Sequence, residues 1–227
     1  EADGGTVVSD YVFKMSENYS NERNQSGRWQ WPMTAILLSV NAVCFVFQCF
    51  AAYFTNWPVN HYFALSTDGM LHGQVWQLLT FQFLHGGIVH LTYVSFGMGL
   101  VHLLFNSIII YCFGRAIEES LGSKTFLKIY FSSGVIGGLI QILVMVLVPH
   151  RFGDAVVGAS AGAAGLIAAF ATLFPERSLT VLLFFIFPIN MKAKVLLLLI
   201  GGFAVFGIIF PQSSIAHAAH LGGMLAG

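Results

Sequence analysis

The stretch Met33–Phe54, MTAILLSVNAVCFVFQCFAAYF, determines the class of fold, because it runs without a charged side chain. At about 1.5 Å of rise per residue, a helix of this length crosses the hydrocarbon core of a bilayer, which is about 30 Å thick. The rest of the chain agrees, since 56% of its 227 residues are hydrophobic and 9% are charged. This composition predicts one membrane domain with several spans.

Apolar segments recur along the chain and predict an all-α polytopic bundle of six transmembrane helices. The expected spans are Met33–Phe54, a long segment ending near Phe113, Ile129–Val148, Ala155–Phe174, Val195–Phe210, and a last one opening near Ala216. From Ala216 to Gly227 a helix rises only about 18 Å, so we expect the last helix to be truncated. We expect residues 31–227 to form the membrane domain and residues 1–30 a polar cytoplasmic tail rather than a signal peptide.

The lysines and arginines are distributed unevenly and predict the orientation of the spans. With the N-terminus inside, only Arg151 falls on the outer side. The cations on the cytoplasmic side are Lys14, Arg23, Arg28, Arg115, Lys124, Lys128, Arg177, Lys192 and Lys194. The simplest location for such a chain is a bacterial inner membrane.

Two connecting segments are too polar or too short to span. Asn56–Gln77 contains Trp57 and Trp76, and tryptophan favours the membrane interface, so we expect this segment at the outer interface. Val181–Ile189 is apolar but short and lies between polar residues, so we expect it at an interface as well.

Charge and cysteine content exclude several functional classes. The formal net charge is zero and no basic stripe is present, which argues against nucleic-acid binding. The three cysteines lie in apolar spans, which argues against a disulfide framework or a cysteine metal site. We therefore expect no metal and no cofactor, and we expect the lipid bilayer as surroundings.

Ser160 and His220 are the strongest candidates for chemistry. Ser160 lies in VVGASAG at the start of the fourth segment, and His220 opens the sixth, so the topology places them at similar depth. A serine becomes a good nucleophile when a neighbouring base takes its proton. A membrane serine alone is commonly a packing residue, but an ionisable residue within a membrane indicates function. We therefore expect Ser160 as nucleophile and His220 as base.

Histidine and glycine spacing adds two further interpretations. His217 and His220 share a helix face, which is compatible with a metal pair, but no acidic or cysteine ligand has matching spacing, so a base is favoured. The small-residue pairs Gly158/Gly162 and Gly223/Gly227 predict close approach of the fourth and sixth helices.

His102 and Asn106 are the candidates for stabilising an oxyanion. They are four residues apart, hence on one helix face. Counted from the cytoplasmic helix ends, His102 lies at about 18 Å and Ser160 at about 22 Å, whereas His90 would lie at about 36 Å. The alternative for Asn106 is hydrogen bonding between helices. Depth therefore favours His102 over His90.

Taken together, these residues resemble the rhomboid family of intramembrane serine proteases. The matching motifs are Trp76-Gln77, HLLFN at 102–106, GRAIE at 114–118, Gly158-Ala159-Ser160, and His220 followed by Gly223 and Gly227. The resemblance implies a six-helix fold and a serine–histidine dyad that cleaves transmembrane protein substrates.

The chain departs from the family pattern at three places. Ala161 follows the nucleophile where the family usually has glycine, and Ala164 stands where an aromatic residue is common. The motif Val-His-Leu also occurs twice, so Thr92–Leu103 appears as an insertion, and we expect a helix continuous from about Thr92. Two alternatives to a protease stay open: an inactive rhomboid-like protein that binds or moves membrane helices, and a proton-coupled transporter.

Overall fold

A computed structural model describes the chain over residues 32–55, 57–86, 93–148, 152–183, 187–210 and 215–227. The features predicted from sequence that lie wholly or partly outside these ranges are the tail 1–30, Asn56 at the start of Asn56–Gln77, His90, the start of the inserted stretch at Thr92, Arg151, and the middle of Val181–Ile189.

Helices make up most of the described chain, joined by short turns and two small sheets. The first half contains α2 (Met33–Phe50), a π-helix η1 (Ala51–Thr55), α3 (Val59–Phe63), β1 (Leu65–Ser66), α4 (Thr67–Leu71), α5 (Gln77–Thr80) and a 3-10 helix η2 (Phe81–Phe83). Next come α6 (Tyr93–Ile109), a π-helix η3 (Ile110–Gly114), α7 (Arg115–Leu121) and α8 (Ser123–Leu147). The remainder comprises β2 (Ala155–Val156), α9 (Ser160–Leu173), β3 (Ser178–Leu183), β4 (Phe187–Lys192), α10 (Ala193–Ile209) and α11 (His217–Ala226).

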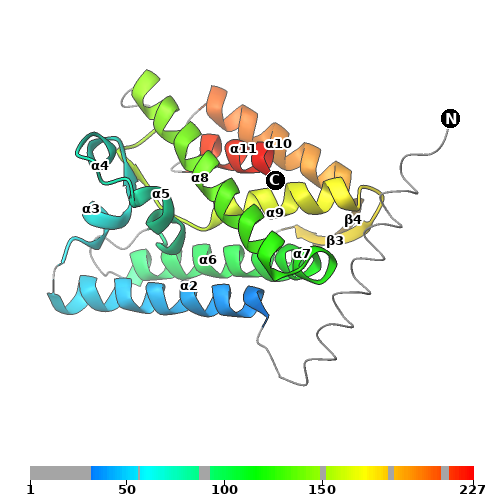
Figure 1. Cartoon of the computed structure of the whole chain (residues 1–227), viewed down its shortest axis with the longest axis horizontal. Helices are drawn as coiled ribbons and strands as arrows, with labels where there is room; N and C mark the ends of the chain where they lie inside the picture. Colours follow the sequence, from blue (N-terminus) through cyan, green and yellow to red (C-terminus); the bar gives the residue numbers. More distant parts are fainter. Residues whose placement is uncertain (1–31, 56, 87–92, 149–151, 184–186, 211–214) are drawn as a thin grey trace.

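The long helices form a bundle around α9. Helix α9 packs against α8 and α11, while α2 and α6 run side by side along one flank (Figure 1). Figure 1 also shows α3 and α4 at one end of the bundle and α7 with the β3–β4 hairpin at the other. Nearly every residue of α9 is buried, so this helix is surrounded by protein on all sides.

Within the described residues, three helical stretches are long and apolar enough to cross a membrane, namely Met33–Thr55, Phe96–Leu121 and Ser123–Leu147. Helices α9 and α10 are apolar but shorter. Each of the six expected spans corresponds to a helix, which confirms the all-α membrane class. The expected helix continuous from about Thr92 is also confirmed over the described residues, since α6 runs unbroken from Tyr93 through His102.

Two helix starts differ from the sequence prediction by more than two residues. The third span begins at Ser123 instead of Ile129, directly after Gly122, whose φ of +83° ends α7. The fourth begins at Ser160 instead of Ala155, because Ala155 and Val156 pair with Ser66 and Leu65 as strands. Gly158 then turns the chain with a φ of +131°, which excludes a helix through this point. Ser160 is therefore the first residue of its helix and does not lie a turn inside it.

The described parts of the short apolar segment Val181–Ile189, residues 181–183 and 187–189, lie in the antiparallel strand pair of β3 and β4. At the base of the hairpin, Lys192 and Lys194 form ion pairs with Glu176. Hydrogen bonds from Lys192 and Lys194 lower the pKa of Glu176 to about 2. The segment is a strand pair instead of a span, as its length indicated, while its position at the interface stays a prediction.

Glycine packing brings α9 and α11 together, although only one of the two predicted glycine pairs does so. A Cβ at Gly223 would lie 2.1 Å from the Ala161 carbonyl oxygen, and one at Gly227 would lie 2.1 Å from the Gly165 carbonyl oxygen. The prediction for Gly158 and Gly162 is wrong, because these two approach His102 and Tyr130 instead. The α9–α11 contact thus places Gly223 and Gly227 against the α9 backbone.

Candidate active site

Ser160 and His220 meet at the start of their two helices. His220 Nε2 lies 2.7 Å from Ser160 Oγ, which is hydrogen-bonding distance, although the residues are sixty positions apart in sequence. Both side chains are half-buried. In this geometry an unprotonated Nε2 accepts the hydroxyl proton of the serine. The pair therefore has the arrangement of a nucleophile and its base.

Contacts between α11 and its neighbouring helices fix the position of His220 along the length of the bundle. Gln141, buried in α8, accepts a hydrogen bond from the Ala219 N–H at 3.1 Å through its Oε1. The N–H groups in the first turn of a helix have no partner within that helix, so this bond caps α11 immediately before His220. A Cβ at Gly137 would lie 2.4 Å from the Ala219 carbonyl oxygen, so α8 and α11 touch backbone to backbone at the same level.

His102 lies beside the serine, across Gly158. A Cβ built at Gly158 would lie 2.8 Å from His102 Nε2 and 3.6 Å from Ser160 Oγ, so both groups border the same small space. Any side chain at this position would occupy that space, which gives the glycine a steric role besides its positive φ. The Gly86 N–H donates a hydrogen bond to His102 Nδ1 at 3.4 Å.

Asn106 lies one turn after His102 on α6 and is buried, with 3% of its surface exposed. Its side-chain Nδ2 has no hydrogen-bond partner among the described residues. A buried donor without a partner is costly and calls for an explanation. A donor kept for a group that arrives only with substrate is one such explanation.

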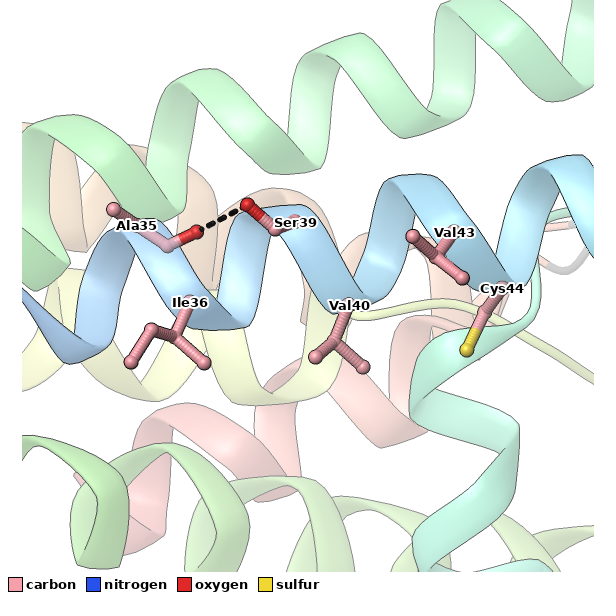
Figure 2. A pocket seen from close by; sticks show the side chains of 6 residues that line it. All are labelled: Ala35, Ile36, Ser39, Val40, Val43 and Cys44. Carbon is pink, nitrogen blue, oxygen red and sulfur yellow. Dashed lines mark hydrogen bonds between the residues drawn. The ribbon is translucent and has the colours of Figure 1, made fainter. Parts of the chain in front are cut away.

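The apolar hollow drawn in Figure 2 is separate from this site. It measures about 360 Å³ and lies on α2, between residues with almost entirely carbon side chains. Its lining residues are Ala35, Ile36, Ser39, Val40, Val43 and Cys44. The Ser39 hydroxyl donates to the Ala35 carbonyl at 2.9 Å. Among the residues that the structure describes, no histidine, carboxylate or cation lines the hollow, so it offers mainly apolar contact.

Two buried glutamines near the site were not predicted from sequence. Gln141 caps α11, and Gln48 on α2 bonds to the backbone of His85, which precedes the residue that bonds to His102. A polar amide within a charge-free apolar segment is the available signal, because a membrane helix has to satisfy each such group internally. The sequence does not reveal which backbone group each amide meets.

Where the family often has an aromatic residue, Ala164 lies buried in a cluster with Ala168, Ala204 and Met224. Met224 follows His220 by one helical turn. The helix that carries the histidine therefore packs on α9 through small and aliphatic side chains at this point.

These features define a class: an integral membrane bundle of α-helices that holds a hydrogen-bonded serine–histidine pair at the start of its most buried helix. Residues 91–227 match the Rhomboid domain model, which is more than half of the chain. The chain belongs to the rhomboid family, as its motifs indicated.

Curated relatives agree with this assignment. YdcA of Bacillus subtilis is 29% identical over 204 residues, covering 87% of this chain and 85% of that protein. The rhomboid protease GluP of the same bacterium is 28% identical over 155 residues, covering 68% of this chain and 25% of GluP. The mitochondrial rhomboid protein 1 of Saccharomyces cerevisiae is 29% identical over 126 residues, covering 56% of this chain and 36% of that protein. The chain thus spans most of YdcA and less than half of the other two.

Proposed function

We propose that this chain is an intramembrane serine endopeptidase that cleaves transmembrane segments of membrane proteins. The observation that carries the proposal is the 2.7 Å contact between His220 Nε2 and Ser160 Oγ within an apolar helical bundle. Membership of a family that includes the protease GluP supports it.

In the proposed reaction, Ser160 Oγ attacks the peptide carbonyl while His220 Nε2 takes the hydroxyl proton. The protonated histidine then gives this proton to the leaving amine, and an acyl-enzyme remains on the serine. A water molecule, deprotonated by His220, attacks the ester. The intermediate then expels Ser160 Oγ, which takes this proton back from His220, and the new carboxyl group is released. No third, acidic member is required in this scheme.

The negative oxygen formed in each attack needs hydrogen-bond donors. We assign this role to His102, Asn106 and the backbone N–H of Ser160. Ser160 is the first residue of α9, so its N–H has no carbonyl partner within the helix. Because a helical peptide hides its carbonyls in its own hydrogen bonds, the expected substrate is a transmembrane segment that unwinds easily at small or helix-breaking residues.

We also propose the arrangement in the cell: a bacterial inner membrane, residues 1–30 in the cytoplasm, residues 31–227 as one membrane protease domain, and water entering from the outer side. The cation distribution supports this orientation.

The first experiment tests the serine and the histidine together. The purified chain is mixed with a single-span substrate, and Ser160→Ala and His220→Ala are each expected to abolish cleavage, because nucleophile and base act as one unit. Only protein with an intact Ser160 should be labelled by a fluorophosphonate. Ser132→Ala is a matched control on α8, since this hydroxyl bonds only locally, to the Ile129 carbonyl. Cleavage that persists in Ser160→Ala would falsify the proposal, and a folded wild type without labelling would favour the inactive rhomboid-like alternative.

A further inference from the structure

Gln48, near the end of α2, is fully buried and uses both ends of its side-chain amide for hydrogen bonds to His85, which follows η2, and to Asn60 on α3. Its Oε1 accepts from the His85 N–H at 3.0 Å. Its Nε2 donates to the His85 carbonyl at 3.1 Å and to Asn60 Oδ1 at 3.0 Å. The two backbone partners fix the orientation of the amide, because an N–H can only donate and a carbonyl can only accept.

The backbone segment that Gln48 binds is in direct contact with His102. Gly86 follows His85, and its N–H donates to His102 Nδ1. Since a backbone N–H has no lone pair to offer, Nδ1 must be the unprotonated nitrogen of the ring. The proton of the neutral ring is then on Nε2, the nitrogen that lies beside Gly158 and Ser160.

The Gly86–His102 bond is long, at 3.4 Å, and a hydrogen bond of this length depends on where its donor is held. The donor is the Gly86 N–H, and the two hydrogen bonds between Gln48 on α2 and the backbone of the preceding residue, His85, fix its position. The buried His85 ring adds edge-on contacts to Phe45, at 6.1 Å between ring centroids, and to His102, at 5.4 Å. The position of the His102 ring therefore depends on an amide that lies outside the reacting groups.

We propose that Gln48 is a positioning residue that acts through the His85–Gly86 backbone to keep the His102 proton on Nε2. With this tautomer, an N–H donor faces the place where the oxyanion forms, whereas the other tautomer would present a lone pair to a negative oxygen. The inference rests on the proposed function, in which His102 stabilises that oxyanion.

The test is a double-mutant cycle between Gln48 and His102. Gln48→Met keeps the length of the side chain and removes all three hydrogen bonds. Asn41→Leu is the matched control, because Asn41 is a buried amide two turns earlier on α2 that bonds to the Leu37 carbonyl of its own helix. Each change is made in the wild type and in His102→Ala, and kcat and KM are measured together with thermal unfolding.

We expect Gln48→Met to lower kcat with little change in KM. The loss in kcat should be smaller than the loss of about 10²- to 10³-fold that follows removal of an oxyanion donor. In the His102→Ala background it should cause no further loss, because its target is already absent. Asn41→Leu should have the same effect in both backgrounds. If the kcat losses of Gln48→Met and His102→Ala multiply, or if Gln48→Met leaves kcat unchanged, the proposal is overturned.

A second measurement does not depend on proteolysis. With ¹⁵N-labelled histidine, the His102 signal is assigned by its absence from His102→Ala, and its shift reports which ring nitrogen carries the proton. Wild type and Asn41→Leu should show the Nε2–H form, and Gln48→Met should lose it in part or entirely. An unchanged tautomer in Gln48→Met contradicts the inference even if the chain cleaves. If the wild type fails to cleave, the proposed function fails while the tautomer result still decides on Gln48.

Discussion

Asn106 is buried, and its side-chain donor has no partner in the part of the chain that the structure describes, which leads to a prediction at the scale of one residue. Asn106→Ala should reduce kcat by about 10²- to 10³-fold without abolishing cleavage, because His102 and the Ser160 N–H would still contact the oxyanion. KM should change little, since the donor acts mainly on the transition state. Steady-state cleavage of a single-span substrate over a range of substrate concentrations measures both quantities. An unchanged kcat would mean that Asn106 serves helix packing only.

At this scale the sequence was informative where a polar residue stands out against apolar neighbours. Ser160, His220, His102 and Asn106 were identified in this way, and the structure places the first two in hydrogen-bonding contact and His102 beside them. Their catalytic roles remain predictions. Gln48 was missed because its partner, the backbone of His85, lies 37 residues away and carries no side-chain signal.

At the scale of elements, the α9–α11 contact depends on glycine. In Gly223→Ala the new Cβ would meet the Ala161 carbonyl oxygen at 2.1 Å, and backbone cannot give way as a flexible side chain can. We expect α11 to shift away from α9, with the His220–Ser160 bond lost and cleavage strongly reduced. Fluorophosphonate labelling of Ser160 should fall in parallel.

The control for this prediction is Gly202→Ala on α10, where a Cβ would meet nothing within 4 Å. Replacing an exposed mid-helix glycine by alanine stabilises a helix by about 0.5–1 kcal/mol. Gly202→Ala should therefore keep full activity, with equal or higher thermal stability. Equal activity of both glycine variants would show that α11 tolerates displacement from α9.

Hydropathy predicted the helices as elements but missed some of their starts. An apolar count cannot separate Ala155 and Val156 from the helix that follows, because both strand and helix are apolar here. The separation comes from pairing of Val156 with Leu65, far away in sequence, and from the backbone of Gly158. The partners of Gly158 and Gly162 were likewise set by packing that glycine spacing does not encode.

At the scale of the whole molecule, the two ends of the bundle make the proposed orientation testable. His72 and Ser178 are exposed. His72 directly follows α4 and Ser178 begins β3, and these two elements lie at opposite ends of the bundle (Figure 1). In a background without Cys44, Cys49 and Cys112, a membrane-impermeant maleimide should label His72→Cys in intact cells. Ser178→Cys should be labelled only after the membrane is opened. The reverse labelling pattern would show that the loops that carry most of the lysine and arginine residues lie on the outer side of the membrane.

The start of α9 at Ser160 also has an electrostatic consequence. The peptide dipoles of a helix add up to roughly half a positive elementary charge at its N-terminus, and in surroundings of low dielectric constant such a field is weakly screened. Helix α9 is enclosed by protein along nearly its whole length, and Ser160 is its first residue, so the positive end of the helix lies at the serine. Had the helix begun at Ala155, its positive end would have lain more than one helical turn away from Ser160. The short strand before the serine thus places a permanent positive potential where the proposed reaction creates negative charge.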